Sequence, residues 1–143
     1  MGLRFVERIS DLPADGWNSL FPQDFPFARH EFLAALERHC CVGARSGWTP
    51  RHAVLEDQNG QLLAAAPMYL KTHSYGEFVF DFAWASASQR IGASYYPKAL
   101  VAIPFTPSCG PRFAARNAAA RRTVFSPTPD ASARRSDVRC GSL

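Results

Sequence analysis

The chain has 143 residues, of which 47% are hydrophobic and 13% aromatic, and its formal net charge is +4. This size and composition indicate one soluble globular domain. No apolar stretch approaches the ~20 residues of a membrane-spanning helix, and the N-terminus lacks the apolar core of a secretory signal, so we expect a cytoplasmic protein without a membrane span. The four cysteines follow neither a disulfide framework nor zinc-ligand spacing, so no metal site is predicted.

The first third of the chain predicts one strand and two helices. Alternating side chains over residues 3–10 favour a strand. Asp11 and Pro13 suit the start of a short helix that carries Trp17. Residues 29–41 repeat apolar side chains at helical spacing, which predicts a second helix.

A β-hairpin is predicted next. Residues 51–56 and 61–70 are apolar runs on either side of Asn59-Gly60, and both turn residues tolerate a positive φ. Pro67 lacks an N–H group, so we expect it at a sheet edge or a bulge.

The later elements are a short strand or buried extended segment over 77–82, a helix over 83–90 and a strand over 99–103. The order β-α-α-β-β-β-α-β favours an α/β or α+β fold, in which helices flank a mixed sheet. Residues 89–94 half-match the loop with which acetyltransferases hold a pyrophosphate. These residues follow a helix-like stretch, so a helix end capped by Gly92 is the favoured interpretation.

The composition of the chain changes at about Phe113. Residues 1–113 contain ten Lys/Arg and ten Asp/Glu, whereas residues 114–143 contain six Arg and two Asp, so the net charge lies in the tail (6 − 2 = +4). Every Trp, Tyr and His precedes the change, and so does every Phe except Phe125. A segment so poor in large apolar side chains cannot offset its conformational entropy by burial. We therefore predict a domain over 1–113 and a disordered tail over 114–143.

Two polar patches between apolar segments contain the candidate site residues. They are Lys71, His73, Ser74, Tyr75, Glu77 and Asp81 in the first patch and Tyr95, Tyr96 and Lys98 in the second. Histidine and carboxylate side chains serve as acids or bases, and a lysine can pair with an anionic substrate. In the alternative interpretation, the first patch is a solvated turn with a surface ion pair, and the two tyrosines only pack on a rigid turn.

Four segments of the chain are similar to a known bacterial family. They read AALERHCCVGARSGWTPRHAVLED, APMYLKTHSYGEFVFDFAWA, YYPKALVAIPFTP and GPRF. In order and spacing, from about residue 5 to residue 113, they resemble the opening of predicted N-acyltransferases that are Fem-like, within the GNAT superfamily, and labelled as peptidoglycan-related. The resemblance implies a longer protein with two GNAT-like lobes, of which this chain is the N-terminal part.

The resemblance also implies an activity, which is the transfer of an acyl or aminoacyl group to an amine. Its donor would be an acyl-CoA or an aminoacyl-tRNA, and its acceptor a small molecule or a cell-wall precursor. The positions that match the family are assigned to a substrate channel, because the resemblance fixes no mechanism. From the chemistry that acyl transfer needs, the catalytic candidates are Glu77, His73 and Tyr75, with Glu77 or His73 as the base and Tyr75 or Tyr96 as the acid for the leaving group. The substrate-binding candidates are Lys71, Ser74, Asp81, Tyr95, Tyr96, Lys98 and Thr106.

The basic tail has two explanations at this stage. Fourteen of the sixteen Lys/Arg residues are Arg, which fits a GC-rich gene, and such DNA read out of frame yields Arg, Ala, Pro and Ser. In this hypothesis the tail is a frameshift product, and the truncated chain lacks the donor site and is inactive. The alternative is a non-catalytic binding domain whose tail contacts RNA or an acidic partner. The arginines available for such contacts are Arg116, Arg121, Arg122, Arg134, Arg135 and Arg139.

Overall fold

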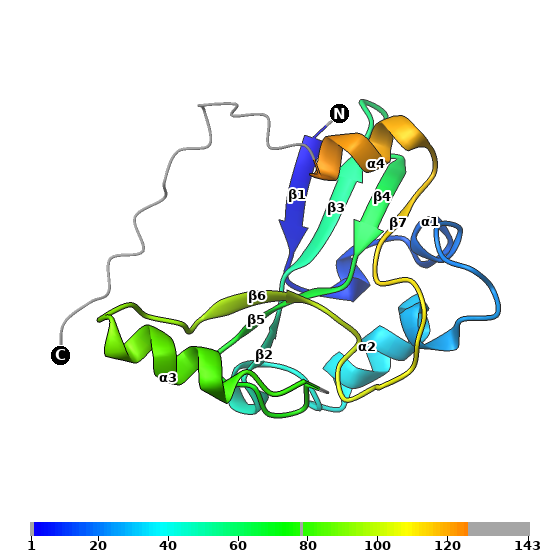
Figure 1. Ribbon diagram of the computed structural model, residues 1–143. Coiled ribbons are helices and arrows are strands. Elements are labelled where there is room, and N and C mark those ends of the chain that lie inside the picture. The colour runs from blue at the N-terminus through cyan, green and yellow to red at the C-terminus, as the bar shows by residue number, and fades with distance from the viewer. Residues whose placement is uncertain (1, 78, 126–143) are drawn as a thin grey trace, which may run out of the picture.

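The computed structural model of the protein describes residues 2–77 and 79–125 and contains two antiparallel sheets with helices around them (Figure 1). The four-stranded sheet has the order β1-β3-β4-β7, formed by Gly2–Val6, His52–Glu56, Leu62–Ala66 and Ala114–Ala115. The three-stranded sheet has the order β2-β5-β6, formed by Trp48–Pro50, Met68–Lys71 and Lys98–Val101. The α+β class is confirmed, although the strand pairs in these ranges are antiparallel and lie in two sheets instead of one mixed sheet.

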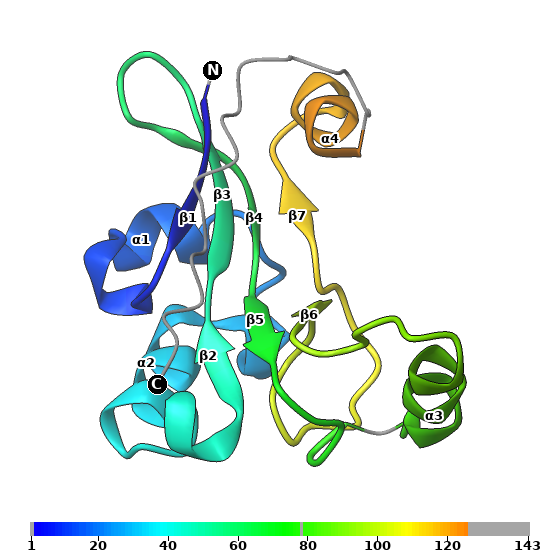
Figure 2. The ribbon, with the colours of Figure 1, turned by 90° about the vertical axis from the view of Figure 1, so that its left-hand side faces the viewer.

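One long hairpin supplies strands to both sheets, because β2 continues into β3 and β4 continues into β5 (Figure 2). The predicted turn is confirmed: Gly60 has φ of 78°, and Asp57 Oδ1 accepts hydrogen bonds of 2.8 Å from the N–H groups of Asn59 and Gln61. Pro67 lies between β4 and β5, where its missing N–H interrupts the ladder and the chain passes from one sheet to the other.

Two helices cover one face of the four-stranded sheet. They are α1 (Ala14–Asn18) and α2 (His30–Arg38), which form within the ranges predicted from the sequence, and 3-10 turns precede them at Ile9–Asp11 and Pro26–Ala28. Trp17 and Leu33 are fully buried against sheet residues that include Val54. The indole N–H of Trp17 donates a hydrogen bond of 2.8 Å to the carbonyl oxygen of Ala28, so the largest core side chain also satisfies its polar atom. A third 3-10 turn, Ala44–Ser46, leads into β2.

The composition change at residue 113 is not a structural boundary. β7 pairs with β4 at Ala114 and Ala115, and the next helix, α4 (Ala118–Phe125), places Ala120 against Leu55 and Ala64 in the core. The small alanine side chains pack here together with the larger side chains of Leu63 and Phe113. The prediction of disorder is therefore wrong for residues 114–125, and the rest of the predicted tail, 126–143, lies outside the described residues.

The strand predicted over 77–82 is also wrong for the residues that the structure describes. Glu77 follows a turn in which its N–H donates to the carbonyl oxygen of Ser74 at 3.2 Å, and Phe82 already begins helix α3 (Phe82–Arg90). The apolar run misled the prediction because Val79 and Phe80 are exposed instead of alternating between a core face and a solvent face.

Helix α3 confirms the helix predicted over 83–90, and it ends as the sequence indicates. Gly92 has φ of 72°, and its N–H donates to the carbonyl oxygen of Gln89, while the N–H of Ala93 donates to the carbonyl oxygen of Ser88. Residues 89–94 therefore form a helix C-terminus.

Candidate functional site

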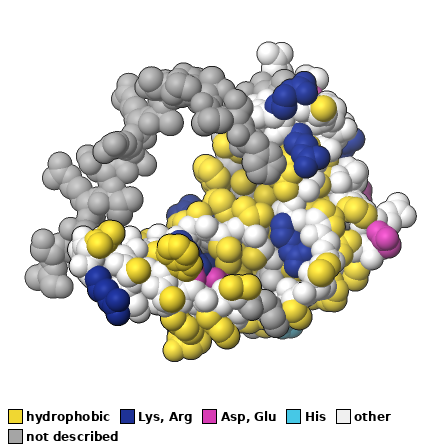
Figure 3. Space-filling view, viewed as in Figure 1, with side chains coloured by type: hydrophobic (Ala, Val, Ile, Leu, Met, Phe, Trp, Pro, Cys, Tyr) yellow, Lys and Arg dark blue, Asp and Glu magenta, His cyan; other side chains and the backbone are white. Residues whose placement is uncertain are grey.

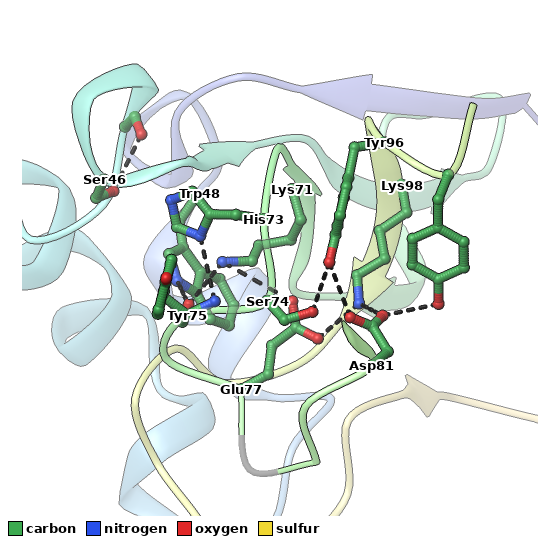
Figure 4. Close-up of polar contacts among 12 residues, drawn as sticks. Ser46, Trp48, Lys71, His73, Ser74, Tyr75, Glu77, Asp81, Tyr96 and Lys98 are labelled. Atoms are coloured by element: carbon green, nitrogen blue, oxygen red, sulfur yellow. Dashed lines mark hydrogen bonds and ion pairs between the residues drawn. The ribbon is translucent and has the colours of Figure 1, made fainter. Parts of the chain in front are cut away.

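The two predicted polar patches meet where β5 lies beside β6. Lys71 on β5 pairs in register with Lys98 on β6, so two cations stand on neighbouring strands. The loop between β5 and α3 supplies Glu77 and Asp81 beside them (Figure 4). We call the group formed by Lys71, Ser74, Glu77, Asp81, Tyr95, Tyr96 and Lys98 the charged cluster.

Opposite charges alternate through the charged cluster. Lys98 Nζ donates to Glu77 Oε2 at 2.6 Å and also contacts Asp81, while Lys71 Nζ lies 3.8 Å from Glu77 Oε1. Exposed fractions of the side chains are 0% for Lys71 and 8% for Glu77. The interpretation of this patch as a solvated turn with a surface ion pair is therefore wrong. Four ionic groups are held largely out of water and neutralise one another in pairs.

Asp81 organises the second half of the charged cluster. Its carboxylate accepts hydrogen bonds from the hydroxyl groups of Tyr95 at 2.7 Å and Tyr96 at 2.9 Å, and Tyr96 shares a further hydrogen bond of 2.7 Å with Ser74. Burial alone would raise the pKa of Asp81, but the hydrogen bonds from Lys98, Tyr95 and Tyr96 hold it below its ordinary value. Asp81 therefore stays ionised, and both tyrosines are fixed as donors.

Tyr95 and Tyr96 hold their protons more tightly than an ordinary tyrosine. The hydrogen bond to Asp81 raises the pKa of Tyr95. Burial raises the pKa of Tyr96, and Asp81 adds to that increase. The interpretation in which these tyrosines only pack on a turn is therefore incomplete, because their hydroxyl groups bind the carboxylate of Asp81.

Lys71 occupies an unusual position for a cation. Its Nζ lies 3.8 Å from the centroid of the Trp48 indole and donates a hydrogen bond of 2.9 Å to the carbonyl oxygen of Tyr75. The indole N–H of Trp48 donates to the same oxygen at 3.1 Å. Burial lowers the pKa of Lys71 to about 8, against the opposing attraction of Glu77. This lysine can therefore change its charge near neutral pH.

Two of the predicted catalytic side chains lie beside the charged cluster and do not join it. His73 Nδ1 accepts a hydrogen bond of 3.2 Å from the N–H of Tyr75, and the far side of its ring packs on Gly47, which leaves no room for a Cβ. The ring of Tyr75 is 65% exposed and contacts His73 and Phe82. Tyr75 contributes its backbone carbonyl to the site, as the acceptor for Lys71 and Trp48.

Glu77 borders two cavities of about 270 Å³ each. The first, which we call the β6 cavity, lies along β6 and the segment after it, and its polar side chains include Glu77, Thr106 and Arg112. Thr106 donates a hydrogen bond of 2.9 Å to the carbonyl oxygen of Pro104. The second cavity is lined by Gly76, Glu77, Phe80 and Phe105. Glu77 is thus the charged residue of the cluster that lines both of these cavities, although its side chain is only 8% exposed.

Sequence reasoning missed two residues of this site, Trp48 and Arg112. Trp48 meets Lys71 because the two are register partners of β2 and β5, a pairing that local sequence does not reveal. Arg112 reaches the β6 cavity from a loop far along the chain. The sequence feature that did indicate this site was the density of polar side chains between residues 71 and 81.

Other kinds of site receive no support within the described ranges. No group of three or more His, Cys, Asp or Glu side chains is arranged to hold a metal ion there. None of the helices in those ranges combines the length and apolar character needed to cross a bilayer.

One arginine of the basic tail is hydrogen-bonded to the body of the protein. Arg116 donates to the carbonyl oxygen of Leu62 at 2.8 Å and to the hydroxyl of Ser19 at 2.9 Å, so it fixes β7 to the body. Arg121 and Arg122 are exposed on α4. The other predicted contacts, Arg134, Arg135 and Arg139, lie outside the described residues.

Comparison with known proteins identifies the family of this chain. No curated protein and no solved structure matches the chain. A model of the FemAB-like family, described as peptidoglycan biosynthesis or recognition, matches residues 8–138. The match includes the whole charged cluster and continues past residue 113, where the resemblance noted in the sequence was expected to end. The chain therefore belongs to the FemAB-like family.

Proposed function

We propose that this protein takes part in the transfer of an aminoacyl or acyl group to the amine of a cell-wall precursor, with the charged cluster at the acceptor side of the reaction. Family membership supports transfer of this kind. The observation that carries the proposal is the buried carboxylate of Glu77 at the border of two cavities, with a cation on either side. The donor is an aminoacyl-tRNA or an acyl-CoA.

The chemistry requires a base and a proton donor. The amine nitrogen attacks the carbonyl carbon of the donor, a C–N bond forms, and the C–O bond of an ester or the C–S bond of a thioester breaks. Glu77 accepts the proton that the nitrogen loses, and this proton then reaches the leaving oxygen or sulfur. Glu77 suits the role better than His73 because Glu77 borders the cavities.

A proton donor for the leaving group is available within the charged cluster. Of the two predicted tyrosines, Tyr96 has its hydroxyl inside the cluster, where it bonds to Ser74 and Asp81. The ring of Tyr75 lies at the surface. We therefore propose that Tyr96 gives its hydroxyl proton to the leaving oxygen or sulfur and regains a proton from Glu77, so that the proton lost by the amine reaches the leaving group through Tyr96, with Asp81 as the residue that positions it.

The test is a transfer assay on the full chain with a labelled aminoacyl-tRNA or acyl-CoA and a precursor peptide that bears a primary amine. We expect Glu77→Gln to lower kcat/KM by about a hundredfold or more, the usual contribution of a general base. Glu31→Gln, an exposed glutamate on α2, is the matched control.

An unchanged kcat/KM in the Glu77→Gln protein would remove Glu77 from the mechanism. The same assay tests the hypothesis that the chain is truncated, lacks the donor site and is therefore inactive. Product formation by the wild-type chain would refute that inactivity. No product with either donor would refute transfer by this chain alone.

A further inference from the structure

As a more specific form of the proposed function, on which it rests, we infer that the acceptor is an extended peptide, bound as an added strand along the free edge of β6. The peptide backbone pairs with the backbone of Ala99 and Val101. Its side chains on one face lie in the β6 cavity, which Glu77 also lines.

The pairing of β5 with β6 fixes which backbone groups of β6 point outward. The N–H of Ala102 donates a hydrogen bond of 3.1 Å to the carbonyl oxygen of Pro67, and this pair continues the register of the two strands. Hydrogen-bonded and non-hydrogen-bonded pairs alternate in an antiparallel ladder. The backbone of Leu100 is therefore bonded to β5, whereas the N–H and C=O groups of Ala99 and Val101 point away from it.

The opposite side of β5 agrees with this alternation. Met68 is the register partner of Val101, and its carbonyl oxygen accepts a hydrogen bond of 2.8 Å from the N–H of Arg51, directly after β2. Within the described ranges, no other segment hydrogen-bonds to the outward groups of Ala99 and Val101, and both residues are exposed. Donors and acceptors thus repeat at a spacing of two residues, which is the pattern that an added strand matches.

The β6 edge also lacks the features that usually protect a sheet edge from pairing, which are short length, proline and exposed charge. The strand β7 has only two residues, β2 includes Pro50, and β1 presents Arg4 to solvent. The strand β6 begins with Lys98, but this ammonium is bonded to Glu77 and Asp81 in the charged cluster and is 18% exposed. Of these four edge strands, β6 is therefore the one best suited to accept a further strand.

The β6 cavity gives room for the side chains of such a strand. Four consecutive residues, 100–103, line it, and because successive side chains of a strand point to opposite faces, a cavity that touches all four lies along the edge. Its polar side chains Glu77, Thr106 and Arg112 are each hydrogen-bonded within the protein. Main-chain pairing and apolar contacts, instead of a free charge, would therefore hold the peptide.

The test measures binding to the full chain without any donor, by calorimetry with the acetylated and amidated pentapeptide Ala-Val-Lys-Val-Ala. We expect saturable binding below about 1 mM. Two N-methylated forms are compared, one methylated at its second and fourth residues and one at its third and fifth. Because alternate N–H groups of an added strand face β6, one form should bind at least about tenfold more weakly and the other within about twofold of the parent.

Two substitutions at one position separate the backbone of β6 from its side chain. Val101→Pro removes an outward N–H that is not bonded to β5, and it should weaken binding by about tenfold. Val101→Thr keeps this N–H and should change the affinity by less than about threefold. Glu31→Gln, at an exposed position on α2, should leave binding unchanged. Urea unfolding of each variant confirms that it is folded.

Amide hydrogen exchange locates the peptide on the chain. The N–H of Leu100 is bonded to β5 and should be protected with or without the peptide. The N–H groups of Ala99 and Val101 should exchange rapidly in the free chain and at least about tenfold more slowly with saturating peptide.

Three results would overturn the inference. They are no saturable binding up to about 10 mM, an equal loss of affinity with both N-methylated forms, and protection of Ala99 and Val101 in the free chain. If that protection grows with protein concentration, a second copy of the chain occupies the edge instead of a peptide. Because no donor is present, these results are separate from failure of transfer. A chain that binds the peptide as expected but transfers nothing would refute only the proposed function.

Discussion

Lys71 shows how one residue can serve both the fold and the site. Its aliphatic stem is enclosed, its ammonium lies on the face of Trp48, and its charge is balanced by Glu77. Burial nevertheless dominates at Lys71, so its pKa falls to about 8. At Lys98 burial also lowers the pKa, but the hydrogen bonds to Asp81 and Glu77 outweigh it, so the pKa of Lys98 is raised. Two lysines on neighbouring strands thus have opposite pKa shifts.

The shift of Lys71 predicts that the free energy of unfolding increases between about pH 8 and pH 10. The pKa of this lysine is about 8 in the folded chain and 10.5 ordinarily, so in this interval the unfolded chain retains a proton that the folded chain has released. Stability therefore rises with pH. The raised pKa values of Tyr95 and Tyr96 act in the opposite direction only above their ordinary 10.0.

Urea unfolding at a series of pH values measures this effect. The Lys71→Met variant should lose the rise, whereas Arg90→Met, at an exposed position on α3, should keep it. Parallel profiles for wild type and Lys71→Met would contradict the assignment.

At the scale of elements, β7 and α4 complete the body of the protein. Ala114 and Ala115 add a strand to the edge of β4, and Ala120 on α4 is 1% exposed. The packing of these alanines, together with a family match that runs to residue 138, counts against a change of reading frame at residue 113.

A matched pair of substitutions on α4 tests this packing. Ala120→Glu places a carboxylate against Leu55 and Ala64 and should lower the free energy of unfolding by about 2 kcal/mol. Ala119→Glu, the exposed neighbour, should change it by less than about 0.5 kcal/mol. Denaturant unfolding distinguishes the two outcomes, and equal, negligible effects would mean that α4 does not dock on the sheet.

Elements with strong local signals were predictable from the sequence. The Asn59-Gly60 hairpin and α2 follow from turn chemistry and helical spacing, which need no knowledge of distant contacts. β7 was not predictable, because its stability comes from pairing with β4 more than from its own two alanines. The apolar run after Glu77 was wrongly predicted to be a strand, because in sequence its exposed side chains resemble those of a buried strand.

The candidate site was predictable as two patches but not as one cluster. Asp81 meets Tyr95 and Tyr96 only because β5 and β6 place Lys71 opposite Lys98. Such a register depends on the whole sheet. The prediction of catalytic side chains at His73 and Tyr75 stays untested, although neither side chain faces the cavities that Glu77 borders.

At the scale of the whole molecule, large apolar side chains gather on the surface around α3 and the loop before it, and Figure 3 shows part of this apolar surface. Val79, Phe80 and Trp84 are among them, and Trp84 is 72% exposed. Strand β1 also presents Leu3 and Phe5 to solvent. Apolar surface of this extent is uncommon on a monomer and favours association.

We therefore expect the protein to self-associate as its concentration increases. Trp84→Lys should shift light scattering and gel filtration toward the monomer, because it places a charge within the apolar surface. Ser86→Lys, on the same helix, adds the same charge at a polar position and should have little effect. A monomer at every concentration, with sharp cooperative unfolding, would contradict this expectation.

The hairpin shared by the two sheets sets an order in which the chain can assemble. Leu55 pairs with Ala64 across a short loop, whereas β1 and β7 reach their partners from distant parts of the chain. Closing a short loop loses less entropy than closing a long one, so the hairpin can form before either end arrives. The strand that carries Lys71 belongs to this early unit. The proposed acceptor side of the site would then begin to form in the middle of the chain, before the two ends of the chain join the sheets.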